Sequence, residues 1–344
     1  MPKTFTDAAG RALTRHALNG PTMGTRWSAL FYAAPGFDAE PLRAAMAAAV
    51  TEVDCQMSVW KPDSDLNRLN RAAPEQWLTL PAQLMEVLET GLGIGRASGG
   101  AFDIGLGDAV TAWGFGPAAA DPQAIAAARK QARVPAHKLL ELDLAGGRAR
   151  KHGTASFDLN GIAKGYGVDR LAAAASAHGL EGALLAIDGE LRALGSRPDG
   201  SGWPVAVEAP MPGHRAVHSV LALADAAVAT SGNYRHYVDL GDRRLGHTID
   251  PRTGAPLATA SDQVTVLAQD GISADAWATA LTVMPPDQAL RLAATTGLSA
   301  LILGPGRGLA TGTFAAPARP DTRPPSTLPA PADRPAPPQA CPQP

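Results

Sequence analysis

Apolar residues recur at helical spacing in six segments of the chain. Residues 38–56 illustrate the pattern with four such positions: Leu42, Met46, Val50 and Val53. They stand three or four residues apart and therefore share one face of an α-helix. Proline at a first helical position and a capping aspartate mark two further helix starts. The pattern predicts helices over residues 38–56, 81–97, 121–132, 162–178, 273–284 and 286–296.

Short apolar runs joined by tight connections fill much of the remaining sequence. They predict strands over residues 25–33, 183–188, 190–195, 204–209, 218–223, 227–230, 235–240, 243–249 and 262–268, and hairpins over 137–152 and 299–314. So many consecutive strands with short connections argue against a regular doubly wound sheet. We expect an α+β fold in which antiparallel or mixed β-sheets are flanked by helices.

The carboxyl-terminal segment differs from the rest of the chain. Residues 317–344 contain eleven prolines and almost no large apolar side chain. Such a segment buries too little surface to offset its ordering entropy, so we expect a disordered, Pro-rich tail. A ligand for a proline-binding domain is the alternative interpretation.

Composition excludes several classes of protein. The 344 residues carry a net charge of -2, so the chain lacks the basic surplus that binds a nucleic-acid backbone. Its two cysteines, Cys55 and Cys341, cannot form a disulfide framework or a cysteine-based zinc site. No apolar run is long enough for a transmembrane segment. The amino terminus has no apolar signal region, which predicts a cytoplasmic protein unless a leader has been removed.

Five polar clusters, most of them containing glycine, carry the candidate chemistry. They cover residues 20–25, 57–65, 99–105 and 158–165, and, as a pair, 230–235 with 247–254. Each taken alone also suits an ordinary turn, as Asp250-Pro251-Arg252-Thr253-Gly254 does. The run Gly161-Ile162-Ala163-Lys164-Gly165 is more specific, because its glycines permit close backbone approach and its lysine opens a helix where an anion can bind.

Asp275 and Thr279 form a candidate metal site on the predicted helix 273–284. Residues four apart share a helix face, and a carboxylate with a hydroxyl offers the oxygen ligands that Mg²⁺ prefers. A capping carboxylate and a threonine that bonds back to its own helix are the alternative. Among the eight histidines, only His247 ends a strand just before a turn, a common place for site residues.

In this order, the clusters resemble the ApbE family of FAD:protein FMN transferases, from about residue 20 to residue 314. The matching blocks are TMGT, MS-x-W-x-PDSDLNRLN, GAFDIGLG, DLNGIAKGYGVDR, IDGELRALG, ATSGNYRHY, H-x-IDPRTG and ADAWATAL. The resemblance implies a transferase domain over residues 19–315, between an N-terminal extension (1–18) and the tail (316–344).

The resemblance also implies an activity and a set of site residues. Members of this family move FMN from FAD, their substrate, to a Ser or Thr of an acceptor flavoprotein with a D-x-x-[ST]-G-[AS]-T motif, and they release AMP. They use a divalent cation, usually Mg²⁺, with Mn²⁺ as the alternative. By position, the metal ligands would be Gly161 (through its carbonyl), Asp275 and Thr279. The FAD contacts would be Met23, Trp60, Ala101, Phe102, Asp103, Asp158, Lys164 and Ile249.

Lys164 and the cation would offset the negative charge of the pyrophosphate. The catalytic residues would be Lys164, Asp275 and His247. His247 is preferred over Asp275 as the base that takes the hydroxyl proton, because a metal-bound carboxylate is the poorer base. A metal-dependent FAD pyrophosphatase and a non-catalytic FAD-binding or delivery protein are the alternatives. Many family members begin with a signal peptide and lipobox, so a leader removed from this chain would place the protein in the periplasm.

Overall fold

The computed structural model describes residues 5–6, 10–211, 216–232, 237–240, 243–257, 263–304 and 307–315. The predicted tail and parts of residues 230–235 lie outside these ranges. The helices are α1 (Glu40–Met57), α2 (Asp65–Arg71), α3 (Ala82–Ala97), α4 (Gly107–Ala112), α5 (Pro122–Lys130), α6 (Ala163–Ala177), α7 (Gly271–Val283) and α8 (Pro286–Thr295), with 3₁₀ turns at Ala136–Lys138 and Gly312–Ala315. None of the described helices is long and apolar enough to cross a bilayer.

Nine strands form one antiparallel sheet in the order β1-β2-β3-β7-β8-β11-β16-β17-β18. Their bounds are β1 (Phe5–Thr6), β2 (Ala12–Thr22), β3 (Thr25–Ala33), β7 (Ala183–Ile187), β8 (Glu190–Leu194), β11 (Ala227–Gly232), β16 (Gln263–Ala268), β17 (Ser299–Gly304) and β18 (Arg307–Ala310). This architecture confirms the expected α+β class with antiparallel sheets.

The other described strands form smaller sheets. A three-stranded sheet contains β4 (Leu78–Thr79), β6 (Arg148–Lys151) and β5 (Leu140–Asp143); two-stranded sheets are β9 (Trp203–Glu208) with β10 (Val217–Leu223), β12 (Tyr237–Leu240) with β13 (Arg243–Gly246), and β14 (Ile249–Asp250) with β15 (Ala255–Pro256).

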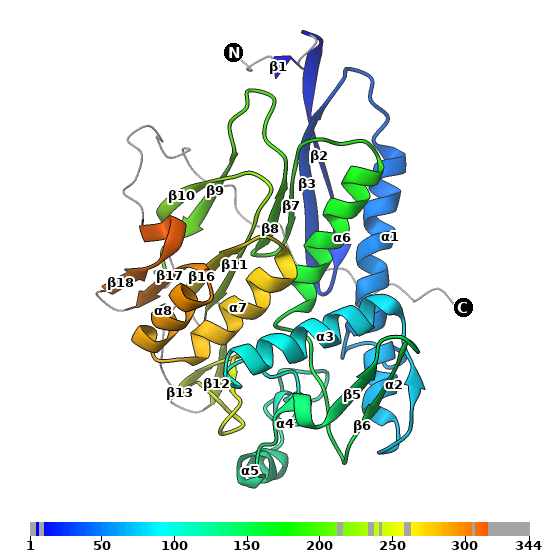
Figure 1. Ribbon diagram of the computed structural model, residues 1–344, viewed down its shortest axis with the longest axis vertical. Coiled ribbons are helices and arrows are strands. Elements are labelled where there is room, and N and C mark those ends of the chain that lie inside the picture. Colours follow the sequence, from blue (N-terminus) through cyan, green and yellow to red (C-terminus); the bar gives the residue numbers. More distant parts are fainter. Residues whose placement is uncertain are drawn as a thin grey trace.

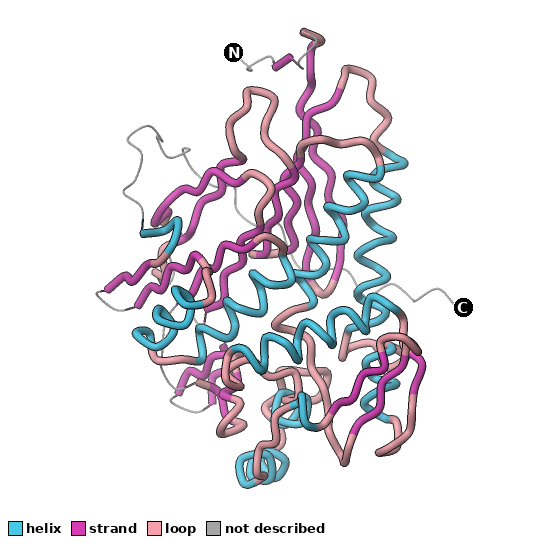
Figure 2. The backbone as a smooth tube through the Cα atoms, in the orientation of Figure 1, coloured by secondary structure: helices cyan, strands magenta, loops and turns pink. Residues whose placement is uncertain are grey.

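Helices cover one face of the large sheet, as Figures 1 and 2 show for α1, α6 and α7. Successive side chains of a strand point to opposite faces of the sheet, so neighbouring residues of β11 pack in two different hydrophobic cores. Ala227 and Ala229 of β11 pack in the core that contains α7, whereas Val228 between them packs with Trp203 of β9. The β9–β10 ribbon therefore covers the face of the sheet opposite α7.

Most sequence-predicted elements are confirmed. The four apolar residues predicted for one face of the first helix are buried in α1, and the Asp121 side chain caps α5 by accepting from the Gln123 N–H. The sequence did not predict β2, which begins at Ala12 and so crosses the boundary set at residue 18. Most of its side chains are exposed or half-buried, so no apolar alternation marks it.

The short helices α2 and α4 were also missed, because six or seven residues are too few to establish a helical period. Local caps hold α2 instead. The Ser64 side chain accepts a hydrogen bond from the Asn67 N–H at 3.1 Å, which satisfies one of the unpaired donors of the first helical turn.

Candidate active site

One cavity of about 1410 Å³ contains every residue that the sequence singled out. These twelve residues line it: Met23, Trp60, Ala101, Phe102, Asp103, Asp158, Gly161, Lys164, His247, Ile249, Asp275 and Thr279. They come from loops, strand ends and helices distributed over most of the chain, so only the tertiary fold brings them together.

Met23 reaches the cavity from the tip of the β2–β3 hairpin. Met23 and Gly24 have φ values of 46° and 69°, which is the two-residue turn whose twist matches that of antiparallel strands. The methionine tolerates this conformation at a cost, whereas Gly24 adopts it freely. The turn brings the Met23 Cε methyl close to Gly167 in the first turns of α6.

Two aromatic side chains supply flat apolar surface to the cavity wall. Trp60 is 57% exposed, which is unusual for so large an apolar side chain. Its loop is tied down by the Lys61–Asp54 ion pair at 3.1 Å. Phe102 is buried, and its N–H donates to Ser98 Oγ at 3.0 Å. An exposed indole beside a fixed phenyl ring suits the stacking of a planar ring system.

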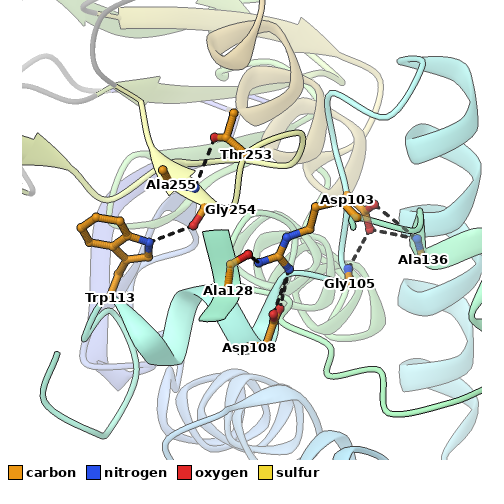
Figure 3. A network of polar contacts seen from close by, with 10 residues as sticks. Asp103, Gly105, Asp108, Trp113, Ala128, Ala136, Thr253, Gly254 and Ala255 are labelled. Atoms are coloured by element: carbon orange, nitrogen blue, oxygen red, sulfur yellow. Dashed lines mark hydrogen bonds and ion pairs between the residues drawn. The ribbon is translucent and has the colours of Figure 1, made fainter. Parts of the chain in front are cut away.

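Asp103 fixes the loop that carries Ala101 and Phe102. Its Oδ1 accepts hydrogen bonds from the Gly105 N–H at 2.7 Å and from the Ala136 N–H at 3.2 Å (Figure 3). Burial raises the pKa of Asp103, and these two N–H bonds oppose the rise. The carboxylate therefore orders the cavity wall as well as facing the cavity.

Asp158 is held by its neighbour Asn160. The Asp158 Oδ1 accepts from the Asn160 N–H and its Oδ2 from the Asn160 side-chain amide, both at 3.0 Å. Burial raises the pKa of Asp158 to about 6, although the Asn160 N–H lowers it. The ionised carboxylate is thus costly in the folded protein.

Asp275 lies where α6 and α7 cross at close range. A Cβ added to Gly165 would lie 2.2 Å from the Gly271 carbonyl oxygen and 2.6 Å from Asp275 Cβ, so only glycine fits there. The Gly165 N–H donates to Asp275 Oδ2 at 2.9 Å. Burial raises the pKa of Asp275, whereas the Lys164 charge and the Gly165 N–H lower it.

Thr279, one turn after Asp275, faces the backbone of Gly161. A Cβ on Gly161 would lie 3.1 Å from Thr279 Oγ1. Thr282 on the same helix bonds back to the Ala278 carbonyl at 2.8 Å, as the structural alternative requires, but the described residues hold no such bond for Thr279. The Thr279 hydroxyl is therefore available to a ligand.

This donor set fits a hard divalent cation. Asp275 uses Oδ2 for the Gly165 N–H, and no hydrogen bond within the described ranges engages Oδ1. A carboxylate oxygen, a hydroxyl and a backbone carbonyl are all oxygen ligands, which Mg²⁺ takes together with waters or phosphate oxygens. The described part of the chain holds no group of three His, Cys, Asp or Glu side chains that could bind a metal by themselves.

Lys164 does not stand alone at this site. Its Nζ lies 2.9 Å from Glu190 Oε1 and 3.8 Å from Asp188 Oδ2. Burial lowers the pKa of Lys164, but the attraction of Glu190, Asp275 and Asp188 outweighs that effect and leaves the pKa above its usual value. Burial raises the pKa of Glu190 to about 7 although the Lys164 charge lowers it. The ammonium is thus a fixed, shared cation.

His247 lies in the segment between β13 and β14, not at the end of a strand as expected, and Ile249 is the first residue of β14; both line the cavity. The His247 side chain is exposed, and Ile249 is buried against the core that contains Trp113. Trp113 Nε1 donates to the Gly254 carbonyl at 2.8 Å, which ties α4 to the turn after β14 (Figure 3). An imidazole open to the cavity can accept a proton from a ligand there.

A sequence model of the ApbE family matches residues 23–302. The chain belongs to the ApbE family. A FAD:protein FMN transferase of Klebsiella pneumoniae is 33% identical over 314 residues, with 89% of each chain covered. That of Escherichia coli K12 is 31% identical over 294 residues, with 83% of each chain covered.

Solved structures agree with this assignment. The flavin transferase ApbE from Vibrio cholerae superposes with a TM-score of 0.78 at 30% identity, covering 88% of this chain and 98% of that one. The apo form of the flavinyl transferase ApbE from Pseudomonas stutzeri gives a TM-score of 0.76 at 32% identity, covering 88% and 96%.

The sequence missed the acidic partners of Lys164 in this ApbE-family chain. Asp188 and Glu190 were assigned to a strand and its neighbour, and no role was given to either. The signal available was a glutamate at the start of a strand, directly after an Asp-Gly turn. Its burial beside a lysine that lies 26 positions earlier could not be inferred from spacing.

Proposed function

We propose that this chain transfers the FMN half of FAD to a Ser or Thr hydroxyl of an acceptor flavoprotein and releases AMP. The observation that carries the proposal is the convergence, in one cavity, of an oxygen-donor set at Asp275, Thr279 and Gly161 with aromatic surface and a histidine. The names of the curated relatives support the same activity.

In the proposed reaction, the hydroxyl oxygen of the acceptor forms a bond to the phosphorus of the FMN half. The phosphoanhydride bond breaks, and AMP leaves with the bridging oxygen. His247 takes the hydroxyl proton, because its side chain is exposed to the cavity whereas Asp275 is buried and bonded to a backbone N–H. The new bond is a phosphoester.

The remaining residues bind and orient the substrate. Trp60 and Phe102 offer surface for the flavin or adenine ring, and Lys164 holds a fixed positive charge near the pyrophosphate. Mg²⁺, with Mn²⁺ as the alternative, would be held by Asp275, Thr279 and the Gly161 carbonyl and would neutralise charge on the pyrophosphate and the departing AMP.

The test is one incubation of purified protein, FAD and Mg²⁺ with a peptide that carries the D-x-x-[ST]-G-[AS]-T motif. We expect the peptide to gain the mass of FMN less water, with an equal amount of AMP. Asp275→Asn should lower the rate at least about a hundredfold, since it removes the only carboxylate of the donor set. His247→Asn should lower the rate of FMN transfer, since it removes the proposed base.

Other outcomes identify the alternatives. Free FMN and AMP with unmodified peptide would indicate a pyrophosphatase, because water would then replace the hydroxyl at the same site. FAD recovered intact after long incubation with Mg²⁺ and acceptor would indicate a binding or delivery protein.

A further inference from the structure

The cavity extends beyond the proposed FAD and metal residues to one edge of the β9–β10 ribbon. Five consecutive residues of β9, from Pro204 to Glu208, line it. Successive side chains of a strand point to opposite faces, so a run of consecutive lining residues means that the cavity follows the strand's edge. Within the described ranges, β9 pairs only with β10, and that edge has no strand beside it.

The backbone groups on this edge can be assigned from three observations. Pro204 has no N–H to donate. The Glu208 carbonyl accepts from Gln263 Nε2 at 2.8 Å, outside the ribbon. On the other side, the Ala209 N–H donates to the Ala216 carbonyl within the ribbon at 2.8 Å. Since the two sides alternate along a strand, the N–H and C=O of Ala206 point toward the cavity.

Gln263 marks one end of the edge with an unsatisfied acceptor. This cavity-lining residue is fully buried, and its Nε2 donates to the Glu208 carbonyl and, at 3.4 Å, to Thr265 Oγ1. The two donor contacts fix which end of the amide is nitrogen. Among the described residues, its Oε1 has no hydrogen-bond partner. A buried acceptor without a donor is costly, and a ligand N–H would relieve that cost.

The floor between this edge and the proposed reaction centre is a strip of sheet. It is lined by Leu184, Leu191, Val228, Thr230 and Thr265, on the face of the sheet opposite α7. The cavity also includes Glu190 and Gly232 at the ends of β8 and β11, and Lys164, which pairs with Glu190 there. The whole cavity, about 1410 Å³, exceeds the roughly 300–1,000 Å³ of a pocket for one small ligand. No residue assigned to FAD or to the metal lies on β9, so this part of the cavity has room for a second reactant.

We infer that the acceptor protein binds here as an extended segment, which pairs its main chain with the free edge of β9 and donates an N–H to Gln263 Oε1. The inference rests on the proposed function, which requires a polypeptide hydroxyl to reach the same cavity. A strand edge recognises an extended main chain of any sequence, and a third strand stabilises a two-stranded ribbon. His247 and Asp275 line the same cavity, so the accepting side chain can reach them without leaving it.

A matched pair of proline variants tests the inference. Ala206→Pro removes the N–H that faces the cavity, two residues after Pro204 on the same edge of β9. Ala222→Pro removes an N–H from the opposite, outer edge of the ribbon and does not line the cavity. For the peptide with the D-x-x-[ST]-G-[AS]-T motif, we expect Ala206→Pro to raise KM about three- to tenfold, the loss of one main-chain hydrogen bond.

Two control measurements, the Kd for FAD and the kcat, distinguish a loss of acceptor binding from a general defect. The Kd for FAD and the kcat should stay at the wild-type level in Ala206→Pro, and Ala222→Pro should match the wild type throughout. Equal effects of the two prolines would overturn the inference. So would a rise in the Kd for FAD confined to Ala206→Pro, because the edge would then belong to the flavin site.

Hydrogen exchange on the unmodified protein removes the dependence on variant folding. We expect the peptide to slow exchange of the Ala206 amide in the presence of FAD and Mg²⁺, and unchanged exchange in β9 would overturn the inference. Failure of the proposed function is a different result: the wild-type protein would then transfer no FMN to the peptide.

Discussion

The buried carboxyl of Asp158 gives a quantitative test of the cavity's electrostatics. Its pKa is about 6 in the folded protein against an ordinary value of 3.8, because burial disfavours the ionised form. A difference of just over two pKa units corresponds to about 3 kcal/mol of unfolding free energy. Asp158→Asn keeps the shape and an acceptor for the Asn160 N–H but removes the charge and the bond from the Asn160 side-chain amide. The pH-dependent part of that free energy should therefore be recovered, offset by a constant loss from the missing bond.

The sign of the pH dependence follows from the raised pKa. Wild-type stability from this group is complete below the ordinary pKa and is lost as pH rises through the folded value. The stability of the Asn variant relative to the wild type should therefore rise by about 2 kcal/mol between pH 4.5 and pH 7.5. Urea unfolding of both proteins across this range measures the difference.

Asp143→Asn provides a control of opposite sign. The N–H of Gly146 and the Arg148 side chain lower the pKa of Asp143. Its replacement should reduce stability at neutral pH, and the reduction should disappear on acidification. A difference between Asp158→Asn and the wild type that does not vary with pH would refute the assignment of the raised pKa to burial.

Two further predictions concern the helix crossing and the metal ligands. Gly165→Ala should lower the free energy of unfolding by about 1–3 kcal/mol, because its Cβ would meet the rigid Gly271 carbonyl. Gly93→Ala, in open space on α3, should raise the free energy of unfolding by about 0.5–1 kcal/mol. Urea unfolding that ranks the two variants equally would contradict the crossing geometry. Thr279→Val should raise the Mg²⁺ concentration needed for half-maximal FMN transfer about tenfold. Thr282→Val should leave that concentration unchanged, because the Thr282 hydroxyl bonds only to its own helix. A Mg²⁺ titration in which both variants behave alike would contradict the ligand set.

Local patterns allowed most elements to be predicted. The strand expected at residues 25–33 coincides with β3, and helices α3, α6 and α8 begin and end within a residue or two of their predicted bounds. These segments carry their own signals: a regular apolar period and, at several ends, proline or glycine. β2 has no such signal, because it is defined by pairing with β3 rather than by a buried face of its own.

The candidate site residues were recognisable as motifs, but their interactions were not. Asp275 and Thr279 could be placed on one helix face from their spacing alone. The proximity of Gly161 to Thr279 and the ion pair of Lys164 with Glu190 join segments far apart in the sequence. No local rule specifies such neighbours, because they depend on how α6 crosses α7 and on which strand follows which in the sheet.

By itself, the sequence determined the α+β class, most helices and strands, the family and the residue types available for chemistry. These depend on periodicity, turn residues and short motifs, which act over a few positions. The tertiary structure alone decided that the motifs share one cavity, that Lys164 is a shared cation, and that β9 presents a free edge beside the buried Oε1 of Gln263. These features depend on burial and on pairing between distant segments, both of which exist only in the folded chain. Burial then shifts pKa values and can leave a polar group without a partner.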